Sequence, residues 1–475
     1  MLLRRWLQPM AEAINLDLLN GRSRLHLVGV AGAGMSALAK LTHQAGLVVS
    51  GSDLRGGIEL ATLADLGVST WAGHRPEMVA GVDLVVASSA VPDSDPELVA
   101  AAAAGIEVWR RPRLLETITE NLPTIGPTGT HGKTTTSALL VMGLRGTGID
   151  PSFVVGGELL DLGTNAHLGG DPPFVLEVDE AFGTFELLTL KGLVVTSIEA
   201  EHLDYFETLD RMEEIFVDVS RRVDGPVLCC IDDPGALRVA QRTRSLTYGF
   251  DRRADWRLSG LVESANEVRF RLEPPEHGTP VLGDVRIPRP GRHVALNAAG
   301  ALALLTELGH DPVRAAAGMA EFNGVRRRFE LRGTVGGVTL IDDYAHHPTE
   351  VATMIRTARS GGHRRIWAVF QPHLYSRTQA LHQAFGSALA LADRVVVTDV
   401  YASREAPIPG ITGDLVAAAA RRSGAEVVYI PHRSDVAEHL APELEPGDLV
   451  LTMGAGDITL LPTELAALLS GHTTP

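Results

Sequence analysis

The sequence GTHGKT at residues 129–134 has the residue types and spacing of a phosphate-binding loop. Glycines allow backbone N–H groups to converge on phosphate oxygens, and the positive end of a following helix adds to the attraction. Lys133 can place its ammonium on β- and γ-phosphates, and the Thr134 hydroxyl can ligate Mg²⁺. Pro127 occupies the first glycine position of the full Walker motif, so the match is to the shorter G-x-x-G-K-[ST] form.

Lysine is rare in this chain, which makes the loop lysine informative. Of the 42 basic residues only Lys40, Lys133 and Lys191 are lysine. The alternative interpretation of the loop is a glycine-rich turn with a solvated lysine. The strand–loop–helix context and the rarity of lysine favour a nucleotide-binding loop over that alternative.

Acidic and imidazole side chains follow two later strands, in EVDE at 177–180 and IEAEHLD at 198–204. Residues just past the carboxyl ends of parallel strands line the ligand crevice of a doubly wound sheet. Glu180 and His202 could therefore complete a Mg²⁺ site with Thr134. Taken alone, such residues are usually solvated; they indicate a metal site here because they share a domain with the phosphate loop.

A second glycine-rich turn, GVAGAG at 29–34, follows an apolar run, and Asp53 ends the next one. Such a turn can admit a pyrophosphate, and the carboxylate can bind a ribose hydroxyl. The glycine spacing is not that of a dinucleotide fold, and tight-turn packing remains an alternative.

Three polar segments come late in the chain: RRRF at 326–329, DDYAHHPTE at 342–350 and QPHLYSR at 371–377. Arg328 and Arg377 could each hold a phosphate or carboxylate bidentately. Each segment could also be a surface charge run or an ordinary loop. Their position at the exits of one parallel unit favours a pocket that faces the nucleotide.

Alternation of apolar runs and amphipathic stretches predicts an α/β protein with three βα series and parallel sheets. The series begin near Arg24, Pro123 and Phe329. Short alternating runs in 245–288 predict a small antiparallel patch within the second series.

The composition excludes several classes of protein. The chain has 475 residues, 45% hydrophobic, and a net charge of −16, which disfavours nucleic acid as a partner. No run is apolar enough for a membrane span, and Gln8, Pro9 and Glu12 interrupt any signal-peptide core. The only cysteines, Cys229 and Cys230, are adjacent, which suits a reducing compartment. We therefore expect a cytoplasmic protein.

Together these motifs resemble the Mur ligase family, from about Arg24 to Leu469. The segments that carry the resemblance are GVAGAGMSALA, SSAV (88–91), GTHGKTTT (129–136), GTNA (163–166), EVDE, IEAEHLD, GRHVALNAA (291–299), GVRRRFE, DDYAHHPTE, FQPHLYSRT, DVYASREAPIPG and LTMGAGD. DDYAHHPTE and FQPHLYSRT are specific to the branch that adds the first amino acid.

The resemblance implies three domains: a Rossmann-like UDP-substrate domain (22–121), a central P-loop ATPase (122–328) and a C-terminal Rossmann-like amino-acid domain (329–475). It implies ATP and Mg²⁺ as cofactors, and UDP-N-acetylmuramate and L-alanine as substrates. ATP would convert the muramoyl carboxylate into an acyl phosphate, which the amine of L-alanine attacks. We expect a monomer or weak dimer.

The resemblance also implies roles for individual residues. The UDP-substrate positions are Gly32, Gly34, Met35, Ser36, Asp53, His74, Ser88, Ser89 and Ala90. The ATP positions are Gly129, Thr130, His131, Gly132, Lys133, Thr134, Thr135, Asn297, Arg328 and Asp343. The amino-acid positions are Tyr344, His346, His373 and Arg377, the metal positions are Thr134, Glu180 and His202, and the catalytic positions are Lys133, Glu180, His202 and His346.

Some positions depart from the family pattern. Ala181-Phe182 stand where Ser-Asp is usual, Ser197 and Val294 where Asn is usual, and Glu201 where Asp is usual. Two alternatives remain: a ligase of the same family that recycles murein tripeptide, and a nucleotide-binding relative without ligase activity. The HLYSR and YASREAPIPG segments favour the alanine-adding ligase.

Overall fold

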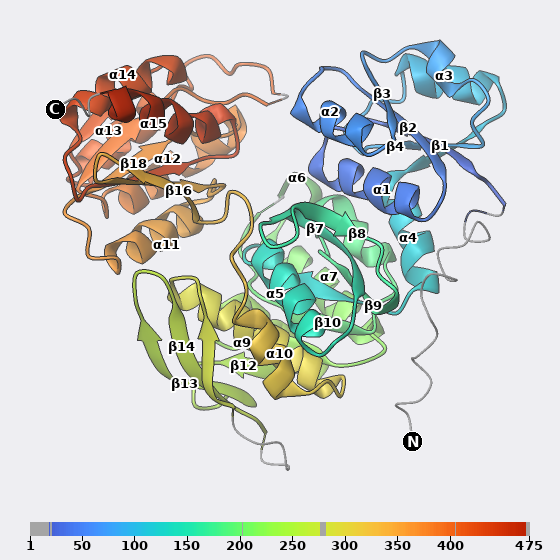
Figure 1. Ribbon diagram of the computed structural model, residues 1–475, viewed down its shortest axis with the longest axis horizontal. Helices are drawn as coiled ribbons and strands as arrows, with labels where there is room; N and C mark the ends of the chain where they lie inside the picture. Colours follow the sequence, from blue (N-terminus) through green and yellow to red (C-terminus); the bar gives the residue numbers. More distant parts are fainter. Residues whose placement is uncertain (1–18, 20, 202, 276–281, 404, 472–475) are drawn as a thin grey trace. The chain divides into compact units, whose positions relative to one another are not determined.

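The computed structural model describes residues 19, 21–201, 203–275, 282–403 and 405–471, which form two compact units. Unit 1 comprises the described residues up to Leu261, with Arg269–Ile287 and Ala295–Asn323. Unit 2 comprises Val262–Val268, Pro288–Val294 and the described residues from Gly324 onward. Figure 1 labels helices and strands of both units.

The first sheet of unit 1 has five strands, all parallel, in the order β3-β2-β1-β4-β5. The strands are β1 (Arg24–Val28), β2 (Val48–Asp53), β3 (Ser69–Ala72), β4 (Leu84–Ala87) and β5 (Glu107–Arg110). The helices between and after them are α1 (Ala33–Gln44), α2 (Ile58–Asp65), the 3₁₀-helix η4 (Pro76–Val79), α3 (Pro96–Ala103) and α4 (Arg111–Asn121). The predicted first βα series is present, and it begins with β1 at Arg24.

The second sheet of unit 1 has ten strands in the order β15-β14-β13-β12-β11-β10-β6-β9-β7-β8. They are β6 (Thr124–Thr128), β7 (Pro151–Leu159), β8 (Thr164–His167), β9 (Asp171–Leu176), β10 (Gly192–Val195), β11 (Val227–Cys230), β12 (Leu246–Gly249), β13 (Trp256–Glu263), β14 (Val268–Glu273) and β15 (Leu282–Ile287). The helices of this part of the chain are α5 (Lys133–Gly146), η5 (Ala181–Leu187), α6 (Leu203–Phe206), α7 (Leu209–Arg222), α8 (Pro234–Thr243), α9 (Arg292–Glu307) and α10 (Pro312–Met319).

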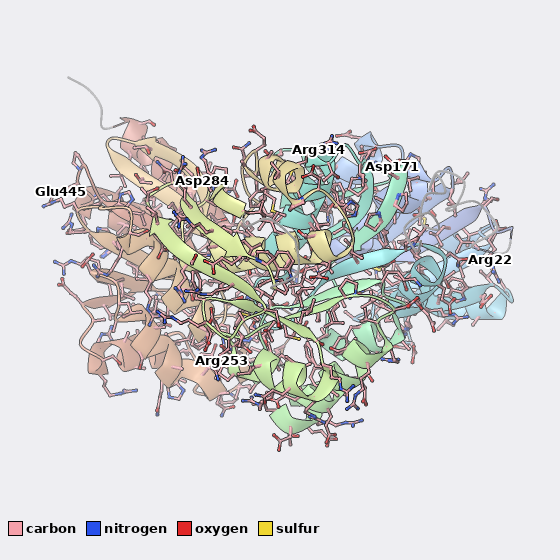
Figure 2. The ribbon with its side chains drawn as sticks, turned by 90° about the horizontal axis from the view of Figure 1, so that it is seen from below. Arg22, Asp171, Arg253, Asp284, Arg314 and Glu445 are labelled. Carbon is pink, nitrogen blue, oxygen red and sulfur yellow. The ribbon has the colours of Figure 1, made fainter. Side chains whose placement is uncertain are left out.

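The antiparallel part of this sheet begins later than predicted. β12 lies within 245–288 but pairs in parallel with both β11 and β13. The connection from β13 to β14 is four residues long, which can join only antiparallel neighbours. In Figure 2, Asp284 marks β15, where it pairs with Arg269 of β14 at 3.1 Å. At the other edge, β7 and β8 form an antiparallel pair that the sequence did not predict.

Unit 2 contains a six-stranded sheet in the order β16-β17-β21-β18-β19-β20. Only the pair of β16 with β17 is antiparallel among the pairings described for this sheet. The strands are β16 (Glu330–Val335), β17 (Val338–Asp343), β18 (Ile366–Phe370), β19 (Arg394–Val397), β20 (Val427–Tyr429) and β21 (Leu449–Met453). The helices are α11 (Pro348–Arg359), α12 (Tyr375–Leu389), α13 (Asp414–Arg422), η6 (Arg433–Asp435), α14 (Val436–Leu440), η7 (Ala441–Glu443), η8 (Asp457–Leu460) and α15 (Leu461–Gly471).

Helices cover both faces of the unit 2 sheet, as in a doubly wound fold. Phe370 belongs to a core with residues of α11, α12 and α13, whereas its neighbour Val369 belongs to a core with residues of α14 and α15. Successive strand residues point to opposite faces, so a strand buried on both sides is apolar throughout. Within the described part of the chain, no helix is both long enough and apolar enough to cross a bilayer.

Candidate active site

The predicted phosphate-binding loop (129–134) connects β6 to α5 in unit 1. Gly129 has a φ of +123°, and a Cβ there would stand 2.5 Å from the Ser197 carbonyl oxygen. Gly132 has a φ of +84°, and its Cβ would stand 2.7 Å from Asn297 Oδ1. Both positions require glycine, because L side chains disfavour such φ values and the neighbouring atoms leave no room. The loop therefore lies directly against Asn297, a predicted ATP contact.

Two residues that follow β10 hold the loop in place. The Thr130 N–H donates to the Ser197 carbonyl oxygen at 2.8 Å, and the His131 N–H donates to Ser197 Oγ at 3.0 Å. The Thr196 hydroxyl donates to the His131 carbonyl oxygen at 2.5 Å. Ser197 departs from the family pattern, and its hydroxyl and carbonyl orient two predicted ATP-binding residues, a role not predicted from the sequence.

Lys133 begins α5 and forms a buried ion pair. Its Nζ donates to the Gly129 carbonyl oxygen at 2.7 Å and to Glu180 Oε1 at 2.9 Å. Burial opposes the charge of Lys133, but the attraction of Glu180 and Asp179 outweighs it and raises the pKa of Lys133. The Glu180 side chain is fully buried, and burial raises its pKa against the opposing effect of the ammonium. The loop thus holds a protonated ammonium where phosphate would bind.

Glu177 belongs to the same site, although it was not among the predicted site residues. The Thr134 hydroxyl donates to Glu177 Oε1 at 3.0 Å, and the Gly156 N–H donates to Oε2 at 2.6 Å. Glu177 follows β9 directly, and β9 pairs with β6, the strand that leads into the phosphate loop. The sequence signal was the position of Glu177 directly after a strand, in EVDE. Predicting its contact with the phosphate loop also required knowing that β9 pairs with β6, which is a tertiary property.

The oxygen atoms at the start of α5 suit a hard divalent cation such as Mg²⁺. The Thr134 hydroxyl and the carboxylates of Glu177 and Glu180 are gathered there, and Glu180 Oε2 is buried without a hydrogen-bond partner. A buried carboxylate oxygen is costly unless a proton or cation meets it, so this donor set fits a metal ion. His202, the third predicted metal ligand, lies outside the described residues. Thr135, in the first turn of α5, is half-buried.

The glycine turn predicted for the UDP substrate lies at the carboxyl edge of the first sheet. The Ala31 N–H donates to Asp53 Oδ2 at 3.1 Å, so the residue that ends β2 fixes the turn after β1. Gly32 caps α1 without a side-chain hydrogen bond. Gly34 follows, and a Cβ there would overlap the guanidinium of Arg111, a residue that sequence analysis did not assign.

The other predicted UDP-substrate residues differ in exposure. Met35 and Ser36 are 2% and 1% exposed, and the N–H groups of both donate to the Gly32 carbonyl oxygen at 2.9 Å. Ser89 and Ala90 are exposed, and Ser88 is half-buried with its hydroxyl accepting the Ala90 N–H at 3.4 Å.

His74 is the most constrained member of this group. Its side chain is 5% exposed, Nδ1 is hydrogen-bonded to Asp95, and Nε2 is buried without a partner. Asp95 also accepts the Glu97 N–H at 2.9 Å and thereby caps α3. Glu97, itself fully buried, accepts the Arg75 N–H at 2.9 Å. The imidazole is therefore held by the helix that follows β4.

In unit 2, Asp343 ends β17 as a buried acceptor. Its carboxylate accepts the Phe329 N–H at 2.6 Å and the Ala345 N–H at 2.7 Å. Burial raises the pKa of Asp343 to about 7, although Arg328 and the two N–H groups oppose the shift. The Arg328 guanidinium carbon lies 5.3 Å from the centre of the Tyr344 ring, a cation–π distance. Both predicted nucleotide contacts of unit 2 thus lie beside Tyr344.

The predicted amino-acid residues form a row of rings at the carboxyl edge of the unit 2 sheet. Ring centres are 5.2 Å apart for Tyr344 and His346, and 6.0 Å apart for His346 and His373. Arg377 Nη1 lies 3.1 Å from His373 Nδ1. Burial, with the nearby His346 and Arg377, lowers the pKa of His373 to about 4, so the ring is neutral near pH 7. Tyr401, which sequence analysis missed, stacks on His373 at 6.2 Å.

Unit 1 carries a phosphate-binding loop with a lysine, and carboxylates lie beside that loop at the edge of its sheet. Unit 2 is doubly wound. Together these features define a nucleotide-dependent α/β enzyme. Three family models match: Mur ligase family, catalytic domain (24–121), Mur ligase middle domain (128–305) and Mur ligase, glutamate ligase domain (327–456). The chain belongs to the Mur ligase family, whose members are ATP-dependent ligases.

The individual relatives are more specific. UDP-N-acetylmuramate–L-alanine ligase of Thermobifida fusca is 41% identical over 465 residues, covering 95% of this chain and 97% of the relative. The ligase of the same name from Acidothermus cellulolyticus is 44% identical over 450 residues, covering 92% and 93%. A crystal structure of UDP-N-acetylmuramate-alanine ligase from Thermotoga maritima matches with a TM-score of 0.82 and 27% identity, covering 94% and 99%.

These comparisons confirm the predicted family and the α/β fold class with three Mur ligase domains. The predicted domain boundaries at 121/122 and 328/329 stay predictions, as do the roles of the individual site residues.

Proposed function

We propose that this chain is the ATP-dependent ligase that joins L-alanine to UDP-N-acetylmuramate, a step of peptidoglycan precursor synthesis. The observation that carries the proposal is the buried pair of Lys133 and Glu180 on a phosphate-binding loop. The relatives named for this reaction, at 41–44% identity over nearly the whole chain, support the choice of substrates.

The chemistry requires activation of a carboxylate, which is a poor acylating agent. A carboxylate oxygen of the muramoyl group attacks the γ-phosphorus of ATP, ADP departs, and an acyl phosphate forms. The neutral amine of L-alanine attacks the acyl carbon, and the tetrahedral intermediate collapses to the amide as inorganic phosphate leaves and the nitrogen loses its proton. Lys133 offsets the negative charge that develops during phosphoryl transfer.

We assign the Mg²⁺ site to Thr134 and Glu180, with His202 as predicted from the sequence and Glu177 added from its contact with Thr134. When bound, Mg²⁺ would neutralise phosphate charge and orient the phosphate oxygens. The protein's own part is to keep two carboxylates and one ammonium fixed at the start of α5, so that little reorganisation is needed on binding.

We assign the amino acid to the ring row of unit 2. Arg377 supplies a permanent cation for the alanine carboxylate. His373 is neutral near pH 7 and can accept a hydrogen bond, whereas a cationic ring would repel an ammonium group. His346 Nδ1 lies 3.1 Å from the Tyr344 carbonyl oxygen, and this contact orients the imidazole within the row.

Phosphate release with defined acceptors tests the proposal. We expect release from ATP only when UDP-N-acetylmuramate and L-alanine are both present, and its loss in Lys133→Ala. A preference for murein tripeptide over L-alanine would favour the recycling ligase, and release independent of any amino acid would favour a nucleotide-binding relative without ligase activity. Near-normal turnover by Lys133→Ala would contradict the assignment of the loop.

The remaining proposals follow from the substrates. ATP and a UDP-linked sugar are cytoplasmic metabolites, so the reaction belongs in the cytoplasm. We propose a monomer or weak dimer, which light scattering across a concentration series would test.

A further inference from the structure

Arg111 lies between the glycine turn and the acidic segment that follows β9. It is the first residue of α4, and its guanidinium fills the space beside Gly34 that any side chain there would need. On the other side its Nη2 lies 3.6 Å from Asp179 Oδ2. Asp179 directly precedes Glu180, the partner of Lys133. One cation thus lies against the turn of the first sheet and beside the carboxylates of the phosphate site.

The guanidinium has unused hydrogen-bonding capacity. The Arg111 side chain is 22% exposed, and within the described residues its only polar partner is Asp179, at more than hydrogen-bond distance. Its neighbour Arg110 has the opposite character, since it donates to the carbonyl oxygens of Ser88 and Val91 at 3.1 and 2.7 Å and pairs with Asp93. Arg110 is therefore structural, whereas Arg111 keeps five N–H donors for a ligand.

The surroundings select an anion as that ligand. Gly34 belongs to the first turn of α1, a helix of 12 residues whose first turn contains no acidic side chain. Backbone N–H groups at such a turn attract phosphate, and a guanidinium in contact with the same turn adds a planar pair of donors. Asp179, the acidic residue that the guanidinium contacts, is 36% exposed and can be replaced as partner by a ligand.

We propose that Arg111 binds the diphosphate of the UDP-linked substrate. The inference rests on the proposed function, because that function supplies the diphosphate. On binding, the guanidinium exchanges its long contact with Asp179 for direct hydrogen bonds to phosphate oxygens. A substrate carboxylate is the other anion that a guanidinium at this place could hold, and the experiment separates the two.

Calorimetric titration of the full chain with UDP and with UDP-N-acetylmuramate tests the proposal. A charge-assisted bidentate contact predicts that Arg111→Gln binds both ligands about tenfold to a hundredfold more weakly, with Arg111→Lys between it and the wild type. The ATP KM should be unchanged. The matched control is Arg113→Gln, which removes an exposed arginine two residues along the same helix, where it pairs with Glu116. Thermal unfolding of each variant shows that it is folded.

Each outcome decides the inference. If Arg111→Gln and the wild type bind UDP equally well, the inference is wrong. This includes the case in which the variant binds only UDP-N-acetylmuramate more weakly, because that result would indicate that Arg111 contacts the carboxylate of the substrate. Equal weakening in Arg113→Gln overturns it as well, since general charge loss would then explain the effect. If the wild type binds UDP in an Arg111-dependent way but releases no phosphate with L-alanine, the proposed function fails and the inference stands.

Discussion

Replacing Lys133 by methionine is expected to make the stability of unit 1 strongly pH-dependent. Methionine keeps most of the side-chain volume but removes the ammonium that lies 2.9 Å from Glu180 Oε1. The carboxylate is fully buried, and its second oxygen already lacks a hydrogen-bond partner. The variant therefore retains a buried carboxylate without its cation.

The magnitude follows from the geometry. Removing one partner of a buried ion pair costs about 3–5 kcal/mol, which corresponds to a fall in unfolding temperature on the order of 10 °C. Burial already raises the pKa of Glu180 above its ordinary value of 4.5, and loss of Lys133 raises it further. A carboxyl group with a raised pKa in the folded state favours folding at low pH. The stability of Lys133→Met should therefore be retained below about pH 4.5, the ordinary pKa of a glutamate, and lost progressively as the pH rises above it.

Thermal and urea unfolding at pH 5 and pH 8 measure this effect. The variants needed are Lys133→Met, Glu180→Gln and the double variant, each compared with the wild type. We expect the double variant to regain stability at pH 8, because a neutral amide replaces the unpaired carboxylate, while phosphate release stays at least about a hundredfold reduced. Wild-type stability of Lys133→Met at pH 8 would refute the buried pair, and restored turnover in the double variant would refute the role of the ammonium.

Three further variants test other parts of the structure. Asp343 has a pKa of about 7, so its protonated form should contribute a few kcal/mol of stability that is complete below about pH 4 and lost as the pH rises through 7. Asp343→Asn should therefore make the free energy of urea unfolding less dependent on pH, and an unchanged pH dependence would contradict the burial of Asp343. Asp95→Asn should raise the KM for UDP-N-acetylmuramate about tenfold, because the amide can still cap α3 but no longer offers His74 a carboxylate. Asp311→Asn, the same change at the cap of another eight-residue helix, should leave this KM unchanged, and equal effects of the two variants would contradict the role of His74. Arg377→Ala should raise the KM for L-alanine at least about tenfold with the ATP KM unchanged, and an unchanged alanine KM would remove it from that site.

Most of the fold could be predicted because its parallel strands are buried on both faces. Runs such as LVVA in β4 and IWAVF in β18 are apolar throughout and buried along their length, and such runs stand out in a sequence. The strand β8, TNAH, carries no such pattern, and its pairing with β7 depends on a neighbour rather than on its own residues. Strands of that kind escape prediction from composition or periodicity.

The same distinction separates the site residues. Gly129, Gly132 and Lys133 could be predicted because a local backbone requirement fixes both the residue types and their spacing. Glu177 and Arg111 enter the site through contacts between elements, with Thr134 in one case and with Gly34 in the other. Their residue types alone do not mark them as site residues, since acidic residues and arginines are common on any protein surface.

Two departures from the family pattern acquire a physical meaning in the structure. The Ser197 hydroxyl accepts the His131 N–H, so a short side chain at this position still anchors the phosphate loop to the end of β10. At Ala181 the backbone takes part instead, because its N–H donates to Asp179 Oδ1 at 3.3 Å and shapes the acidic segment. Asp179 also faces Arg111. The acidic segment, which has Ala181-Phe182 in place of the usual Ser-Asp, therefore supplies a carboxylate to Lys133 and another to Arg111. The segment therefore places carboxylates beside both cations, as the proposed ligase chemistry requires, which argues against a relative that has lost activity.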